Sequence, residues 1–333
     1  MLNRYYYFKI LESSFSMINQ IDEIKNLLAK HSHITIVTHI NPDADTLGTG
    51  LGIFTLLKKT KKVEIVNVSD DLPRYLDFLP SFSKIKKKMD YKNSLIIACD
   101  CGNPDRFGVN LEGREILNID HHASNTSYGV INLVKANYAS ASQVAYTFLK
   151  ALYPIEKEVA ICFYTALLSD TRYFMTKATD KKVFEMAKEL VDIGVEPSKI
   201  SYHFTQRRSL ASLRMLEKVL GTLTLYDEGQ IGTLVATQEA IKQTGVLMSD
   251  MDGFVDYARS LATVEIGIFV TEIENGVRVS LRSKTINVSK IAVAFGGGGH
   301  ILASGFTLQS CSVEKTLKNI LVKIKSLGVL DEK

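Results

Sequence analysis

A histidine and two aspartates lie close together near the start of the chain, in the segment THINPDADTLGTG at 38–50. His39, Asp43 and Asp45 follow a run of β-branched residues and precede a run with helical spacing. Imidazole nitrogens and carboxylate oxygens are ligands that suit manganese, iron(II) or magnesium ions. This turn could therefore supply several metal ligands at once. Asp43 taken alone could instead be a helix N-cap, a position that aspartate favours.

Residues of the same types follow other apolar runs. Asp100 ends SLIIACD, Asp170 ends ICFYTALLSD, and the triplet Asp120, His121 and His122 lies at the end of EILNID. In open α/β sheets, ligands bind beyond the carboxyl ends of the strands, so these side chains can converge on one crevice. His121 and His122 in isolation could be surface or satisfied core residues. Their combination with the other carboxylates favours a common site.

Six such groups are sufficient to hold two metal ions. Two-metal sites place the ions roughly 3.5–4 Å apart and use a carboxylate to bridge them. We predict that Asp100, at the end of a central strand, is the bridge. The remaining ligands divide into His39 and Asp43 for one ion and Asp45, His121 and Asp170 for the other. Manganese is the expected metal, with magnesium or cobalt as alternatives.

The elements that must position these residues follow an α/β pattern. Between residues 34 and 190, short β-branched runs alternate with amphipathic runs, which is typical of a parallel sheet flanked by helices. The predicted strands span residues 34–40, 63–69, 94–100 and 115–120. The predicted helices span residues 44–59, 139–152, 157–169 and 181–193. The continuous apolar runs indicate strands buried on both faces, as in parallel sheets.

A second region with a different pattern follows. Residues 196–220 have no strand pattern and are predicted to be a helical linker. Beyond them lie strand patterns at 221–226, 231–237, 264–274 and 276–283, a glycine cluster at 295–305 and an amphipathic helix near 312–326. The pair Asn275 and Gly276 favours a hairpin turn. We predict a metal-binding domain at 18–195, the linker at 196–220 and a smaller α/β substrate-binding domain at 221–328.

Composition and charge bound the class of protein. The 333 residues are 46% hydrophobic and 23% charged, which is ordinary for a folded chain of two domains. The net charge of +4 does not by itself indicate nucleic-acid binding. The lysine-rich runs at 58–62 and 84–88 are therefore interpreted as solvated faces.

Cysteine usage and hydropathy indicate the compartment. Four scattered cysteines argue against a secreted disulfide scaffold, and the CxC at 99–101 lacks the second pair of a zinc site. No stretch reaches the roughly 18 apolar residues of a membrane span. We expect a cytoplasmic protein that has no membrane partner. Because Met17 opens a helical pattern, residues 1–16 are interpreted as an upstream extension.

Five motifs in this order resemble the DHH phosphoesterases with a C-terminal DHH-associated domain, of the RecJ-like superfamily. They are HxxPDxDxxG at 39–48, the apolar strand ending at Asp100, the triplet at 120–122, LLSDT at 167–171 and GGGGHxxASG at 296–305. The resemblance covers about residues 18–328. One departure is Thr49, where the motif commonly has serine, but the hydroxyl is kept.

The resemblance implies the same metal ligands, with Asp100 shared by both ions, and a phosphate contact for His122. It also implies that Arg282 contacts phosphate and that the glycine cluster binds the nucleotide through Gly296, Gly297, Gly298, Gly299 and His300. Consecutive glycines let the backbone approach a ligand and present N–H groups to phosphate oxygens. Glycine runs are also ordinary loops, and this one lacks the GK[ST] of the Walker motif.

The expected function is a manganese-dependent phosphoesterase that hydrolyses short oligonucleotides or dinucleotides by a two-metal hydroxide mechanism. It would act with or without 3'-phosphoadenosine 5'-phosphate phosphatase activity. The expected partner is short single-stranded RNA or DNA or a dinucleotide, and a homodimer is allowed. A cyclic dinucleotide phosphodiesterase is the main alternative. An inorganic pyrophosphatase would lack the GGGGH cluster, and a non-enzymatic nucleotide-binding module would leave the six metal-type residues unexplained.

Overall fold

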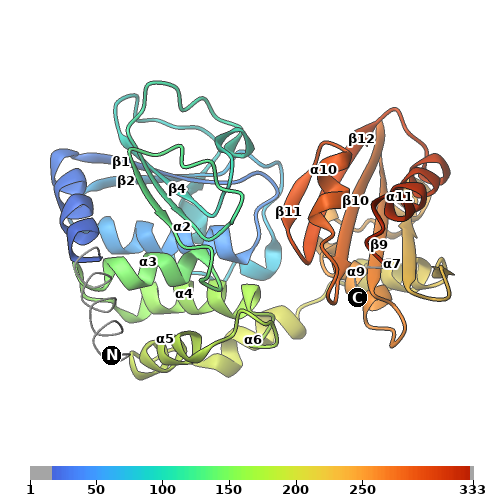
Figure 1. Ribbon diagram of the computed structural model, residues 1–333. Helices are drawn as coiled ribbons and strands as arrows, with labels where there is room; N and C mark the ends of the chain where they lie inside the picture. The colour runs from blue at the N-terminus through green and yellow to red at the C-terminus, as the bar shows by residue number, and fades with distance from the viewer. Residues whose placement is uncertain (1–16, 331–333) are drawn as a thin grey trace, which may run out of the picture. The chain divides into compact units, whose positions relative to one another are not determined.

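The computed structural model describes residues 17–330, and the chain divides into two compact units (Figure 1). The first unit ends at Gln206 and the second begins at Arg207. Residues 1–16, interpreted above as an upstream extension, lie outside the described residues. No helix among residues 17–330 is both long enough and apolar enough to cross a membrane.

The first unit is built on a six-stranded sheet, here called sheet A, with the order β3-β2-β1-β4-β5-β6. Its strands are β1 His33–Thr38, β2 Lys62–Val66, β3 Ile85–Lys86, β4 Leu95–Cys99, β5 Ile116–Asp120 and β6 Ile131–Val134. Every neighbouring pair is parallel, so all carboxyl ends lie at one edge. The four predicted strands are confirmed. The prediction missed β3 and β6, because two and four residues are too short to show a pattern.

Helices cover sheet A. Residues 17–30 are helical, and the other helices of this unit are α2 Ala44–Leu57, α3 Ala141–Leu149, α4 Lys157–Asp170, α5 Lys181–Asp192 and α6 Pro197–Thr205. Helix α2 packs against β1 and β2, and α4 packs alongside α2 (Figure 1). Short segments cover the opposite face, where Phe107 packs against Val37 and Ile96. The four helices predicted for this region are confirmed, with ends that differ by a few residues.

Helix α2 is buried along its whole length, which its glycines make possible. A Cβ atom at Gly48 would lie 2.7 Å from the Cys162 carbonyl oxygen and 2.9 Å from Ala166 Cβ, both on α4. A Cβ at Gly52 would collide with the ring of Phe163. The absence of side chains at these two positions therefore lets α2 and α4 lie in close contact.

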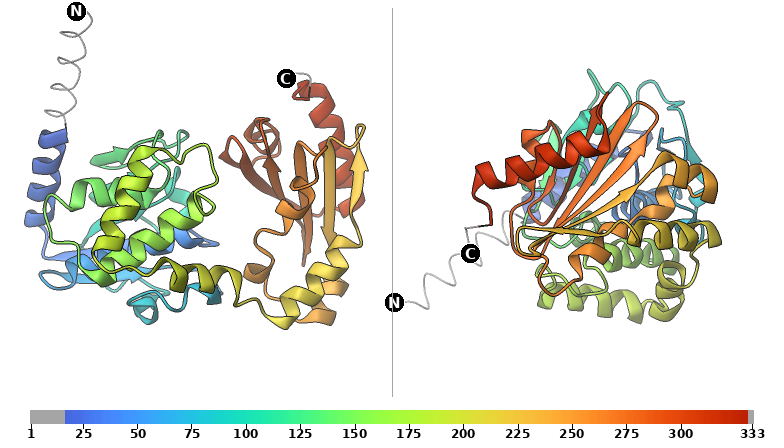
Figure 2. Two further views of the ribbon diagram at one scale, coloured as in Figure 1. Left: turned by 90° about the horizontal axis from the view of Figure 1, so that it is seen from below. Right: turned by 90° about the vertical axis from the view of Figure 1, so that its right-hand side faces the viewer.

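The second unit contains a mixed sheet, sheet B, which Figure 2 shows from two further sides. It has six strands in the order β11-β12-β10-β9-β8-β7. Its strands are β7 Thr224–Tyr226, β8 Ile231–Ala236, β9 Ile266–Ile273, β10 Gly276–Ser283, β11 Gly298–His300 and β12 Ala303–Gln309. Only β8 and β9 pair in parallel; the other neighbours are antiparallel. The predicted β9–β10 hairpin is confirmed. Part of the glycine cluster forms the edge strand β11 instead of a loop.

Sheet B lies between two layers of helices. They are α7 Leu210–Leu220, α8 Gln238–Thr244, α9 Phe254–Arg259, α10 Ser289–Ala294 and α11 Val313–Leu327. Ile320 of α11 packs with Ile268 on one face, and Met215 of α7 packs with Phe269 on the other. This alternation along β9 follows from the period of two in a strand. The chain passes from the first unit to the second between α6 and α7.

Candidate metal centre

The turn after β1 brings His39 and Asp43 to the carboxyl edge of sheet A. His39 Nε2 lies 3.9 Å from Asp43 Oδ2 and 3.6 Å from Asp100 Oδ2. Asp43 is also the N-cap of α2, because its Oδ1 accepts hydrogen bonds from the N–H groups of Asp45 and Thr46, both at 3.1 Å. The two alternative interpretations of Asp43 are therefore compatible. One oxygen caps the helix and the other faces His39.

The orientation of the His39 ring is fixed by its own backbone neighbour. His39 Nδ1 lies 2.9 Å from the carbonyl oxygen of Ile40, which can only accept a hydrogen bond. The proton of a neutral ring therefore belongs on Nδ1, and the Nε2 lone pair faces the carboxylates of Asp43 and Asp100. A histidine that donates from one nitrogen and offers the other to a cation is the usual arrangement in metal sites.

A second group forms around His121. Its Nε2 lies 3.7 Å from Asp45 Oδ2 and 3.2 Å from Asp170 Oδ2. Asp170 is the last residue of α4 and Asp45 lies in the first turn of α2, so the contact between these helices brings the two acids together. His121 follows β5 directly. These three side chains can each place one ligand atom around a common point.

Asp45 is held rigidly by hydrogen bonds. The N–H groups of Ala141 and Ser142, at the start of α3, donate to its Oδ2 and Oδ1 at 2.7 and 3.2 Å. The hydroxyl of Thr49 donates to Oδ1 at 3.1 Å. The hydroxyl that Thr49 shares with serine thus has a role in the fold, which is to orient Asp45.

Asp100 lies between the two groups. Its Oδ2 faces His39, as given above, and its Oδ1 lies 3.5 Å from His121 Nε2 and 3.6 Å from His122 Nδ1. The backbone of Asp100 is left-handed, with φ of 57°, a conformation that aspartate tolerates better than most residues. Among the described residues, no group donates a hydrogen bond to the buried Oδ1. This central carboxylate therefore has acceptor capacity that the protein does not use.

Asp120 has a positioning role that the sequence analysis did not assign. Its Oδ1 accepts the N–H of His121 at 2.8 Å and lies 2.7 Å from His122 Nδ1. Its Oδ2 accepts a hydrogen bond from Asn125 Nδ2 at 2.6 Å. Asp120 thereby fixes the ring of His122. The DHH triplet marks all three residues, but only the side-chain directions distinguish the orienting acid from the candidate ligands.

The carboxylates of the cluster lie close enough together to change one another's pKa. Burial and the neighbouring charge of Asp100 raise the pKa of Asp45 to about 8. Burial and Asp45 raise the pKa of Asp170 well above its usual range. Burial would also raise the pKa of Asp100, but its interactions with His121 and His39, whose Nε2 atoms lie 3.5 and 3.6 Å away, hold it well below the ordinary value. Crowded carboxylates of this kind favour either protons or metal ions.

The pKa values of the three histidines are raised as well. Burial is the largest single influence and lowers the pKa of His39 and His121, but the interaction with Asp100 and the negative charges of the neighbouring acids together leave both values raised. Burial likewise lowers the pKa of His122, and its hydrogen bond to Asp120 raises it above the ordinary value. The neighbouring acids therefore favour the protonated form of these imidazoles.

The donor set fits divalent cations of the manganese or magnesium type. Two groups, His39 with Asp43 and Asp100, and Asp45 with His121 and Asp170, can each surround one ion. Neither group contains a cysteine, and burial raises the pKa of the nearby Cys101 thiol to about 11 and that of Cys99 well above its usual range. Oxygen and imidazole donors without thiolate do not favour a structural zinc site.

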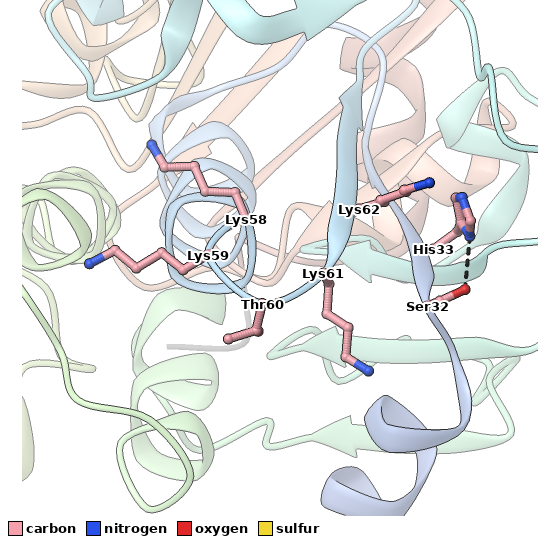
Figure 3. Close-up of a pocket in the computed structure, with 7 residues that line it drawn as sticks. All are labelled: Ser32, His33, Lys58, Lys59, Thr60, Lys61 and Lys62. Atoms are coloured by element: carbon pink, nitrogen blue, oxygen red, sulfur yellow. Dashed lines mark hydrogen bonds between the residues drawn. The ribbon is translucent and has the colours of Figure 1, made fainter.

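A lysine-lined hollow at the other edge of sheet A is not part of this cluster (Figure 3). It is lined by Ser32, His33 and Lys58 to Lys62, and Lys62 pairs with His33 at the first residues of β2 and β1. Figure 3 shows the ammonium groups pointing in different directions instead of toward one point. Lys59 forms an ion pair with Glu156 at 2.5 Å. These observations favour the interpretation as a solvated face.

The candidate substrate residues of the second unit lie on sheet B. Arg282 is on β10, on the face that also carries Arg278 and Ser280, and these three residues line a small pocket. His300 is the last residue of the edge strand β11 and is exposed.

The four successive glycines at 296–299 have different local surroundings, so the fold requires glycine at some of them and not at others. At Gly299, with φ of 134°, a Cβ would lie 2.6 Å from the Ala303 carbonyl oxygen, and at Gly297 it would collide with Gly305. Gly296 has a positive φ of 78°, whereas Gly298 faces open space. The pairing of β11 with β12 therefore explains at least two of these glycines without a ligand.

Buried carboxylates and imidazoles at the carboxyl edge of a parallel sheet form a candidate site for metal ions, and a second unit with a mixed sheet follows. Residues 33–167 match the N-terminal domain of the DHH family, and residues 232–327 match the DHHA1 domain. The chain belongs to the DHH family and is a hydrolase that acts on ester bonds.

Named relatives span nearly the whole chain. The bifunctional oligoribonuclease and PAP phosphatase NrnA of Thermus thermophilus is 30% identical over 305 residues, which cover 90% of this chain and 91% of the relative. A probable NrnA of Streptococcus mutans is 28% identical, covering 89% and 98%. The crystal structure of an exopolyphosphatase-related protein from Bacteroides fragilis has the same fold, with a TM-score of 0.84, 24% identity and coverage of 93% and 97%.

Proposed function

We propose that this chain is a manganese-dependent phosphoesterase that hydrolyses short oligonucleotides or dinucleotides to mononucleotides and also removes a phosphate from 3'-phosphoadenosine 5'-phosphate. The observation that carries the proposal is the central position of Asp100 between two groups of buried ligands. The names of the relatives from Thermus thermophilus and Streptococcus mutans support the substrate class.

The proposed ligands are those predicted from the sequence, with Asp100 shared between His39 and Asp43 on one side and Asp45, His121 and Asp170 on the other. When bound, the two cations would supply Lewis acidity toward the phosphate oxygens and make water acidic enough to act as a nucleophile near neutral pH. The protein contributes rigid ligand positions, because Asp43 is fixed as a helix cap and Asp45 by three hydrogen bonds.

The phosphate contacts are assigned to residues with donors. His122 is fixed by Asp120 through Nδ1, so we assign its Nε2 to a non-bridging phosphate oxygen. In the second unit we assign Arg282 and His300 to the nucleotide, because a guanidinium matches the geometry of a phosphate. Holding the phosphate in line with the attacking water can contribute several kcal/mol to the lowered barrier.

A substrate panel tests the proposal. Purified protein with Mn²⁺ should hydrolyse 5'-phosphorylated diadenylate, short single-stranded RNA and 3'-phosphoadenosine 5'-phosphate, and should lose activity in chelator. Cyclic dinucleotides, longer single strands and inorganic pyrophosphate belong in the same panel. A preference for pyrophosphate or for a cyclic dinucleotide would replace the proposed substrate class. Stoichiometric metal content without turnover of any of these compounds would indicate a binding module.

Arg282→Ala and His300→Ala test the assigned nucleotide contacts. Both should reduce activity on diadenylate far more than activity on a small generic phosphodiester such as bis(4-nitrophenyl) phosphate. Equal losses on the two compounds would show that these residues do not contact the nucleotide.

A further inference from the structure

A short 3-10 helix after β4 places a cation beside the candidate metal centre. This helix, η3 Pro104–Phe107, begins after Asn103, whose side chain accepts the N–H of Asp105. The carbonyl oxygen of Arg106 accepts a hydrogen bond from the N–H of Ile40 at 2.8 Å. This backbone hydrogen bond joins the segment after β4 to the segment after β1. Arg106 Nη2 lies 3.5 Å from His39 Nδ1 as a result.

The contact between Arg106 and His39 cannot be a normal hydrogen bond. His39 Nδ1 carries its proton toward the Ile40 carbonyl oxygen, as argued above. A guanidinium has only donors and no acceptor. The two nitrogens therefore face each other donor to donor, so the guanidinium of Arg106 does not use a hydrogen bond on this ring.

Arg106 has no acidic partner in the part of the chain that the structure describes. The side chain is exposed, and no carboxylate oxygen among residues 17–330 lies within 4.0 Å of its guanidinium nitrogens. It nevertheless stands beside a cluster that contains Asp43 and Asp100. Because the guanidinium of Arg106 forms no ion pair with these acids, its N–H groups can donate to a bound anion.

We propose that Arg106 is a phosphate-binding residue of the first unit, which donates a paired set of hydrogen bonds to the non-bridging oxygens of the substrate phosphate at the candidate metal centre. This inference rests on the proposed function. A guanidinium binds phosphate through two parallel hydrogen bonds, which fixes orientation as well as position. Arg106 would complement His122, which approaches the same centre from the segment after β5.

The test compares Arg106→Ala and Arg106→Lys with Lys59→Ala, which removes a cation from the lysine-lined hollow at the other edge of sheet A. With 5'-phosphorylated diadenylate and Mn²⁺, Arg106→Ala should lower kcat/KM by about 10- to 100-fold, as expected for charge-assisted hydrogen bonds. Arg106→Lys should recover only part of the loss, because an ammonium cannot form the paired contact. Lys59→Ala should match the wild type.

Two further readouts separate phosphate binding from damage to the centre. Manganese content and thermal stability of Arg106→Ala should equal those of the wild type, and added methylguanidinium should restore part of the activity of this variant only. Loss of manganese together with activity, or an unchanged kcat/KM, would overturn the proposal.

Binding measurements test the phosphate contact of Arg106 even if the protein hydrolyses no nucleotide. If the wild type turns over no nucleotide, the proposed function fails, and calorimetry with diadenylate or inorganic phosphate in the presence of Mn²⁺ still tests Arg106. A dissociation constant raised about 10-fold or more in Arg106→Ala supports the phosphate contact, and an equal constant in both proteins refutes it.

Discussion

Sheet A buries carboxylates in two places, and the protein treats them in opposite ways. Glu64 on β2 is almost fully buried, with 1% of its side chain exposed, and accepts hydrogen bonds from the N–H groups of Asp90 and Tyr91 and from the hydroxyl of Thr35. Lys86 Nζ lies 3.5 Å away as a counter-charge. At the carboxyl edge, Asp100 Oδ1 receives no hydrogen bond within the described residues.

The difference distinguishes an acid that stabilises the fold from one that is a candidate metal ligand. A buried carboxylate whose lone pairs are filled by protein donors stabilises a loop and needs nothing from outside. Carboxylates that face one another raise each other's pKa, as Asp45 and Asp170 do, so their surroundings favour bound protons or added cations. Depth of burial alone would not have distinguished the two sites.

The largest expected effect is that of Asp100→Asn. Asparagine tolerates the left-handed backbone at this position, so the fold should be retained while the shared negative charge is lost. Removing several kcal/mol of charge stabilisation should reduce kcat by roughly 1000-fold or more. Steady-state kinetics and bound manganese, measured by mass spectrometry, check this. Near-normal activity of this variant would rule out a central role for Asp100.

The metal-free protein should become less stable as the pH rises from about 4 to about 8. In this range the fold retains protons on Asp45 and Asp170 that the unfolded chain releases above about pH 4, so the folded state binds more protons. The histidines act in the same direction above about pH 6.5, since their pKa values are raised. Asp100, ionised in both states, contributes no slope here.

Thermal unfolding of chelator-stripped protein across this range measures the effect, and we expect the Tm to fall by several degrees. In Asp45→Asn, where this side chain cannot titrate, the Tm should fall less steeply with rising pH. In the wild type, saturating Mn²⁺ should make the Tm rise with pH instead, because cations compete with protons for the same oxygens. If the Tm of metal-free Asp45→Asn depended on pH in the same way as that of the metal-free wild type, the pKa of Asp45 would not be raised by its neighbours.

A smaller effect, on stability and not on chemistry, is expected for Glu64→Gln. The substitution replaces an acceptor-only carboxylate by an amide, so one of the N–H donors of Asp90 and Tyr91 loses its partner. The free energy of unfolding should decrease by about 1–3 kcal/mol. Chemical denaturation measures this loss, while kcat at a temperature well below the Tm should stay at the wild-type value. A fall in kcat would place Glu64 in the functional network.

The smallest effect should come from Lys59→Ala in the lysine-lined hollow. Its ion pair with Glu156 is exposed, and exposed pairs contribute about 0–1 kcal/mol. We expect the free energy of unfolding and kcat/KM to remain unchanged within error. A clear loss of nucleotide binding in this variant would mean that the hollow, and not only the carboxyl edge, holds an anion.

The sequence predicted the sheet and the identity of the clustered residues because each acid ends or follows an apolar run. It could not predict that the three residues of the DHH triplet have different roles, since only the side-chain directions show that Asp120 orients His122. Arg106 carried no periodic or motif signal, because it lies on a four-residue 3-10 helix. The glycine cluster was informative as a motif, but its hydrogen-bonding register with β12 depends on tertiary packing.

Gly48, the final residue of the first motif, has no side chain with which to bind a metal. Its missing side chain lets α2 lie against α4, and these helices carry Asp45 and Asp170. A methyl group at this position would collide with α4 and push the two helices apart. A position that could supply no ligand atom thus helps to fix the distance between two candidate ligands.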